Sequence, residues 1–182
     1  MLLLATLAWA ATPLEVTFTD AEKASLDAGE AVVRTPTADG LVVGAVDIPA
    51  TRQQVMAAVM DFDARVESVG AISAIDVYAP ATDPKGLGTK FTLSVLGTEI
   101  VYYIRYDVAD EGVNFALDKE QTNDLVDSSG GYWTYPEGDE IRLVYWSKTD
   151  TGRSIPRFIR NTLSVRSFRN QLTSMKELAP KK

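Results

Sequence analysis

The longest helical pattern in the chain, residues 155–178, constrains the fold more than any other stretch. No Gly or Pro interrupts it after the first turn, where Pro156 is tolerated because the N–H that proline lacks would have no partner. At 100° per residue its apolar side chains fall in one broad stripe. They are Ile155, Phe158, Val165, Phe168, Leu172 and Met175. A helix of about 24 residues is about 36 Å long, so this helix must cover an apolar face of the domain.

The chain of 182 residues contains neither Cys nor His. Its length suits one domain, without disulfides, thiolate sites or the commonest general base. Asp61 and Asp63 are two residues apart at a predicted helix C-terminal turn, so they face different sides and form no acid–base pair. The other carboxylates are scattered and suggest no ligand set. The sequence therefore predicts no catalytic residue, no metal and no cofactor, and it favours a binding protein over an enzyme.

The formal net charge of −7 is unevenly distributed. From Arg153 to the end, eight basic residues accompany one acidic residue, whereas the rest of the chain holds ten basic and 24 acidic residues. We expect no nucleic-acid partner, because the acidic bulk would repel phosphate. Two interpretations of the basic C-terminal helix remain: transient contact with an anionic membrane surface, or a solvent face that complements an acidic sheet. We expect a monomer.

The first twelve residues, MLLLATLAWAAT, form an apolar run that contains the A-x-A sequence Ala8-Trp9-Ala10. This resembles a secretory signal peptide cleaved after Ala10, too short to span a membrane. The run lacks the usual Lys or Arg at its start, so an ordinary buried segment is the alternative. The signal predicts a periplasmic or secreted location.

Turn residues and periodicity divide the remaining chain into helices and strands. A helix over residues 18–28 precedes a hairpin of strands 30–35 and 41–48, and helices 50–62 and 64–69 follow. From Ile72 onward the apolar period switches to two. The expected strands are 72–78, 89–96, 99–108, 113–119, 125–135 and 141–148. Short connectors between them predict an antiparallel meander.

This order of elements suits a strongly curved antiparallel sheet wrapped around one helix. A lipocalin-like barrel also ends in a helix. Two helices between the early strands argue against that barrel, as does the lack of a Gly-x-Trp near the start.

Several segments resemble the START and polyketide-cyclase superfamily (SRPBCC, helix-grip). Residues 42–51 (VVGAVDIPAT) and 55–63 (VMAAVMDFD) look like its strand, Ile-x-Ala turn and following helix. Residues 73–78 and 86–89 resemble its next strand and loop, and residues 155–178 resemble its closing helix. In the order and sequence pattern of these segments, the chain is most similar to the bacterial START-like, coenzyme-Q-binding and cyclase-like members of the superfamily.

The resemblance covers residues 41–179, after a signal at 1–10 and an N-terminal helix and first strand within 11–40. It implies an α+β helix-grip fold, with a curved antiparallel sheet of about 7–8 strands around the C-terminal helix and two short helices between the early strands. It also implies a cavity that binds a lipid, isoprenoid or sterol-like molecule, either for binding alone or for transport. The alternative is a cyclase- or dehydratase-type enzyme for a polyketide-like substrate. No catalytic motif of the superfamily can be carried over to this chain.

Strand alternation selects the candidate ligand contacts on the sheet. Residues 99–108 are apolar on both faces, and a bulge would bring either Tyr102 or Tyr103 inward. Trp133 follows the stretch Ser-Ser-Gly-Gly, and it is either a ligand wall or plain core. The sheet-side candidates are Phe91, Leu93, Tyr102, Tyr103, Phe115, Leu117, Trp133 and Tyr145.

The closing helix supplies the other candidates, Phe158, Thr162, Val165 and Arg169. Arg169 falls about 20° from Phe158 on the helical wheel, inside the apolar stripe. Two interpretations of Arg169 are open. It meets a ligand carboxylate or phosphate at one end of the cavity, or it reaches the edge of the stripe or a structural carboxylate.

Overall fold

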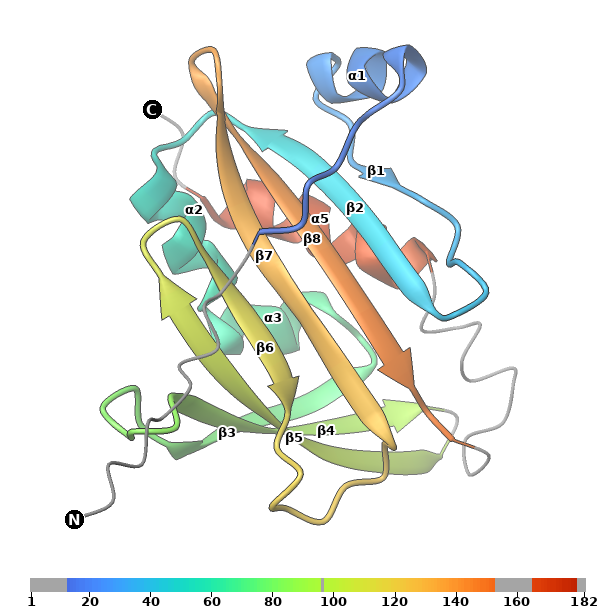
Figure 1. Ribbon diagram of the computed structural model, residues 1–182, viewed down its shortest axis with the longest axis vertical. Coiled ribbons are helices and arrows are strands. Elements are labelled where there is room, and N and C mark those ends of the chain that lie inside the picture. The colour runs from blue at the N-terminus through green and yellow to red at the C-terminus, as the bar shows by residue number, and fades with distance from the viewer. Residues whose placement is uncertain (1–12, 96, 153–164, 180–182) are drawn as a thin grey trace, which may run out of the picture.

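Eight strands form one antiparallel sheet in the computed structural model, which describes residues 13–95, 97–152 and 165–179. Their spatial order is β1-β2-β8-β7-β6-β5-β4-β3 (Figure 1). The strands are β1 Val32–Val33, β2 Leu41–Ile48, β3 Ile72–Ala79, β4 Leu87–Val95, β5 Thr98–Ala109, β6 Gly112–Leu117, β7 Asp127–Glu137 and β8 Glu140–Asp150. The predicted meander is confirmed, because β3 to β7 each pair with the next strand in the chain.

The β1–β2 hairpin joins the far end of this meander. All eight residues of β2 pair antiparallel with β8, from Leu41 opposite Lys148 to Ile48 opposite Ile141. β1 and β3 are therefore the two edges of an open sheet, and the barrel alternative is wrong. The predicted α+β helix-grip fold is confirmed.

The helices in the described ranges are α1 Asp20–Asp27, α2 Arg52–Val59, α3 Phe62–Ser68 and α5 Val165–Leu178. In Figure 1, α3 and α5 lie behind the sheet, and the N-terminal segment crosses in front of it. None of these helices has both the length and the apolar character that a membrane span requires.

The pair of helices between β2 and β3 was predicted, but the break between them lies earlier than expected. The helix expected over residues 50–62 ends at Val59. Asp61 is the N-cap of α3 and accepts a hydrogen bond from the Ala64 N–H at 3.0 Å. Asp61 and Asp63 therefore lie at the start of a helix, where negative charge is favourable, and not at a helix end.

α5 closes the inner face of the sheet. Leu172 and Met175 are buried there, as the apolar stripe predicted. Leu172 packs over Gly44 of β2: a Cβ added to Gly44 would lie 2.8 Å from the Leu172 Cδ1. Glycine at this position therefore lets the helix approach the strand closely. Residues 155–164 of the predicted helix lie outside the described residues.

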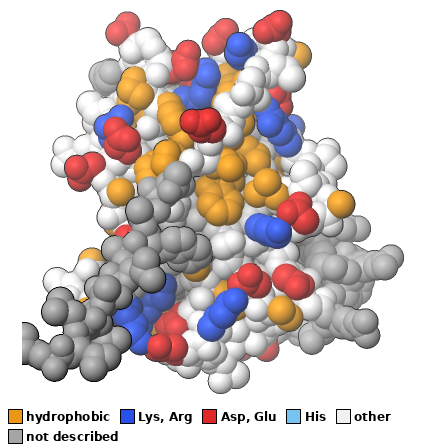
Figure 2. Space-filling model, in the orientation of Figure 1, with side chains coloured by type: hydrophobic (Ala, Val, Ile, Leu, Met, Phe, Trp, Pro, Cys, Tyr) orange, Lys and Arg blue, Asp and Glu red, His pale blue; other side chains and the backbone are white. Residues whose placement is uncertain are grey.

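The outer face of the sheet carries a second, smaller core. Phe18 and Leu26 cover Ala45 of β2 and Val144 of β8. Figure 2 shows apolar side chains gathered over the middle of this face, with acidic and basic ones around them. The N-terminal segment is therefore packed on the sheet, with its Phe18 ring 5.5 Å from the guanidinium carbon of Arg142.

Candidate ligand-binding cavity

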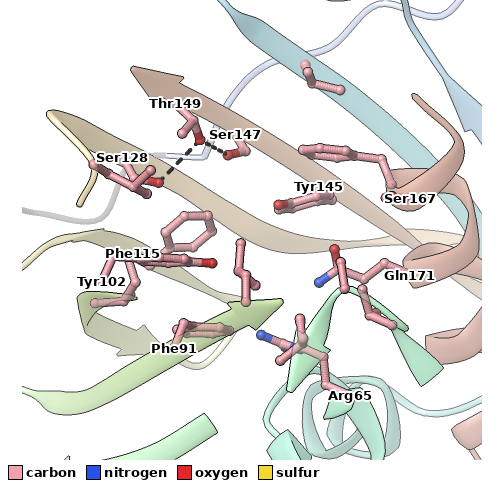
Figure 3. Close-up of a pocket in the computed structure, with 18 of the residues that line it drawn as sticks. Arg65, Phe91, Tyr102, Phe115, Ser128, Tyr145, Ser147, Thr149, Ser167 and Gln171 are labelled. Atoms are coloured by element: carbon pink, nitrogen blue, oxygen red, sulfur yellow. Dashed lines mark hydrogen bonds between the residues drawn. The ribbon is translucent and has the colours of Figure 1, made fainter. Parts of the chain in front are cut away.

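A cavity of about 640 Å³ lies between the inner face of the sheet and the helices α3 and α5 (Figure 3). Strands β4 to β8 form most of its wall, because alternate side chains of each strand point to this face. Arg65 of α3 and Ser167, Phe168 and Gln171 of α5 line it as well, together with residues of the connecting loops. The sheet contributes Val42, Ile72, Phe91, Leu93, Ile100, Tyr102, Ile104, Tyr106, Phe115, Ser128, Tyr132, Tyr145, Ser147 and Thr149.

Stacked aromatic rings form the broad walls of the cavity. Phe91 and Tyr102 are directly opposite in the β4–β5 ladder, and their rings stack with centroids 5.1 Å apart. Tyr132 and Tyr145 are opposite in the β7–β8 ladder and stack at 4.3 Å. Phe168 extends the second stack at 5.0 Å from Tyr145. Strand register thus produces the aromatic walls, because directly opposed side chains on one face touch.

The tyrosines of the cavity keep their protons at neutral pH. Burial raises the pKa of Tyr132 to about 12. Burial also raises the pKa of Tyr102, Tyr106 and Tyr145 above the ordinary value. The Tyr132 hydroxyl accepts a hydrogen bond from Gln171 Nε2 at 2.6 Å. These hydroxyls are therefore neutral hydrogen-bonding groups on an otherwise apolar wall.

Arg65 is the one charged residue among the described residues that line the cavity. It is 5% exposed. Its Nη2 donates to the Val59 carbonyl, and its guanidinium carbon lies 5.4 Å from the Phe62 ring and 5.6 Å from the Tyr132 ring. Its buried Nε has no hydrogen-bond partner among the residues that the structure describes. A buried cation without an anionic partner costs several kcal/mol.

Hydroxyl groups line another part of the wall. The Thr149 Oγ1 lies 3.3 Å from the Ser128 Oγ and 3.4 Å from the Ser147 Oγ. Figure 3 shows these three side chains on the opposite side of the cavity from Arg65. The cavity is therefore apolar in its middle and polar on two opposite sides.

Of the twelve predicted contact residues, Phe91, Leu93, Tyr102, Phe115 and Tyr145 line the cavity. Phe158 and Thr162 lie outside the described residues. The other five are not part of the wall. They are Tyr103, Leu117, Trp133, Val165 and Arg169.

Two of these misplaced residues point to the outer face of the sheet. The β4–β5 register continues without a shift, so no bulge turns Tyr103 inward; it packs edge-on against Tyr78 at 5.4 Å. Trp133 follows the cavity residue Tyr132 in β7 and so faces the other way. Its Nε1 donates to the Asn114 Oδ1 at 2.9 Å. Trp133 is thus neither a ligand wall nor part of the inner core.

The remaining three lie beside the cavity or on the protein surface. Leu117 is buried in the inner core without reaching the wall. Val165 is half-buried, and Arg169 is exposed. The observed inward direction of α5 is set by Phe168, Leu172 and Met175, and Arg169 lies about 100° away from Phe168. The exposed position agrees with the second interpretation of Arg169, in which it reaches the edge of the apolar stripe.

Several wall residues were missed, for two different reasons. Tyr106 and Tyr132 follow the alternation of their strands, and extending that alternation would have found them. Arg65 and Gln171 had no such signal. Arg65 lies on a helix of seven residues, too short for periodicity to show which side faces the interior.

No family model and no curated protein matches the chain. Solved structures do. A STAR-related lipid transfer protein of Xanthomonas axonopodis is 18% identical with a TM-score of 0.60, over 81% of this chain and 90% of that one. A START superfamily protein of Mycobacterium smegmatis is 14% identical with a TM-score of 0.61, over 76% and 96%. The ZhuI aromatase/cyclase of Streptomyces is 13% identical with a TM-score of 0.61, over 76% and 92%. This chain therefore has the fold of START and polyketide-cyclase proteins.

Proposed function

We propose that the protein binds and carries a hydrophobic small molecule, of lipid, isoprenoid or sterol type, in the cavity between the sheet and α5. The observation that carries this proposal is the cavity of about 640 Å³ with stacked aromatic walls. Ligand pockets have this size and this mixture of apolar walls with a few polar groups. The solved structures of the same fold include a STAR-related lipid transfer protein, which agrees with such a role.

The alternative from the sequence, a cyclase- or dehydratase-type enzyme, has less support. One protein of the same fold is an aromatase/cyclase. The described wall residues, however, include no carboxylate, and burial raises the pKa of the wall tyrosines. The wall therefore offers proton donors but no group ready to act as a general base near neutral pH.

Filling the cavity is expected to abolish binding without unfolding the protein. Leu93 lines the cavity at a buried position of β4, and Leu93→Trp places a large ring in that space. We expect the neutral fluorescent probe N-phenyl-1-naphthylamine to bind this variant at least about tenfold more weakly than the wild type. Fluorescence titration measures the difference.

Val77→Trp is the matched control, since Val77 is 55% exposed on β3 and does not line the cavity. Its affinity for the probe should equal that of the wild type. A folded Leu93→Trp variant that binds the probe with wild-type affinity would contradict the proposed site.

We further propose that the chain is exported before it acts. When the full chain is expressed in a bacterium that secretes proteins through signal peptidase, the mature protein should begin at Ala11, because cleavage follows Ala10. Intact mass and N-terminal sequencing of the periplasmic fraction measure this. An intact Met1 on all of the folded protein would refute export by this signal. Contact of the basic C-terminal residues with anionic membranes stays a prediction.

A further inference from the structure

We propose that the cavity selects hydrophobic molecules with an acidic head group, which Arg65 binds. The ligand class is an apolar or aromatic body with one carboxylate or a similar monoanionic group. This inference rests on the proposed binding function, and it adds the chemistry of the head group.

A buried arginine, Arg142, and a half-buried one, Arg105, show what Arg65 lacks. Arg142, 8% exposed, donates to both carboxylate oxygens of Asp47, at 2.8 and 2.7 Å. Arg105 has Asp118 at 3.0 Å. Arg65 is buried as deeply as Arg142, yet none of the salt bridges among the described residues includes it. Its guanidinium stays charged at any pH in which the protein is folded, so the cavity wall carries a positive charge without a counter-charge.

The guanidinium of Arg65 lines the cavity and is only partly engaged in hydrogen bonds to the described residues. The Val59 carbonyl accepts a hydrogen bond from the Arg65 Nη2. The Arg65 Nε has no hydrogen-bond partner among the described residues. Figure 3 shows the guanidinium pointing from α3 into the space beside Phe91 and Gln171. An anionic oxygen placed there would accept a charge-assisted hydrogen bond from the guanidinium, the strongest class available in such a site.

The surroundings of Arg65 favour an anion over a neutral head group. The aromatic rings of Phe62 and Tyr132 screen the cation from water, and low local dielectric strengthens the attraction between opposite charges. A neutral hydroxyl head would fill the same space but leave the positive charge uncompensated. The difference between an acid and its alcohol therefore measures the contribution of Arg65.

Two pairs of probes test the preference for an acidic head group. They also distinguish two kinds of apolar body, an acyl chain and an aromatic ring system. Dodecanoate and 1-dodecanol share a flexible chain, while 2-naphthoate and 2-naphthalenemethanol share a rigid aromatic body. Each is titrated against bound N-phenyl-1-naphthylamine at neutral pH. We expect at least one acid to bind the wild type roughly 10- to 100-fold more tightly than its own alcohol. The pair with the larger ratio identifies the body as an acyl chain or an aromatic system.

Arg65→Met should remove this acid preference, so that each acid and its alcohol bind the variant with affinities within about twofold of each other. Arg65→Gln serves the same purpose if the methionine variant does not fold, because its amide retains a donor for the Val59 carbonyl. Arg169→Met is the matched control: this arginine is exposed on α5, so the wild-type preference should persist.

The outcomes separate this inference from the proposed function. Equal affinities of the wild type for each acid and its alcohol would overturn the role of Arg65 and leave hydrophobic binding intact. An acid preference that survives in Arg65→Met or Arg65→Gln, or that disappears in Arg169→Met, would overturn it as well. Failure of the wild type to bind the neutral probe and all four compounds would reject the binding function itself.

Discussion

Replacing Asp47 by alanine is expected to lower the free energy of unfolding by about 3–5 kcal/mol. Asp47 is 2% exposed and faces Arg142 directly across the β2–β8 ladder. Its loss leaves a buried guanidinium whose remaining carboxylate is the half-exposed Glu137, 3.1 Å away. That second contact places the expected loss toward the lower end of the range. Urea denaturation followed by tryptophan fluorescence measures it.

Two further variants separate burial from charge pairing. Asp127→Ala removes the exposed Lys119–Asp127 pair at 3.2 Å, and it should cost less than about 1 kcal/mol. The double variant Asp47→Leu/Arg142→Leu should recover much of the stability lost in Asp47→Ala. It removes the buried guanidinium together with its carboxylate partner, so no buried charge is left unpaired. If Asp47→Ala cost no more than Asp127→Ala, the buried pair would have no role in holding β2 to β8.

Replacing Leu172 by alanine is expected to cost about 2–5 kcal/mol. Leu172 is fully buried and is the side chain of α5 that packs over Gly44. Truncation would leave a space between helix and sheet that the close backbone of β2 cannot easily fill. The expected result is a lower urea midpoint with little change in the denaturant slope. Because α5 forms one wall of the cavity, the variant should also bind the neutral probe more weakly.

Thr173→Ala is the control for this position. Thr173 is the next residue on α5 and is exposed, so its replacement should change the free energy of unfolding by at most about 0.5 kcal/mol. A Leu172→Ala variant as stable as Thr173→Ala would show that α5 does not depend on this contact.

The strands were predictable because the side chains on their buried face are apolar and those on the other face are more polar. β2 was predicted with its observed bounds, 41–48, and residues 141–148 lie within β8. In such strands one face meets the core and the other does not, so period two is visible in the sequence. The alternation also identified Phe91 and Tyr145 as wall residues.

Arginine positions could not be predicted in the same way. Whether Arg169 falls inside the apolar stripe on the helical wheel depends on the residue from which the angle is measured. In the structure its side chain is exposed to solvent. Arg65 is buried because α3 packs against α5, a helix far from it in the sequence. A charged side chain gives no periodic signal of burial, since most such residues are exposed.

The sequence by itself determined the order of the elements, the antiparallel meander and the apolar stripe of the closing helix, because local turn chemistry and side-chain period specify these. Only the tertiary structure decided which side of β5 faces inward, that Trp133 faces outward, and that Arg65 lies on the cavity wall with no carboxylate partner among the described residues. These features depend on the relative placement of sheet and helices, where burial and pairing join residues far apart in the chain.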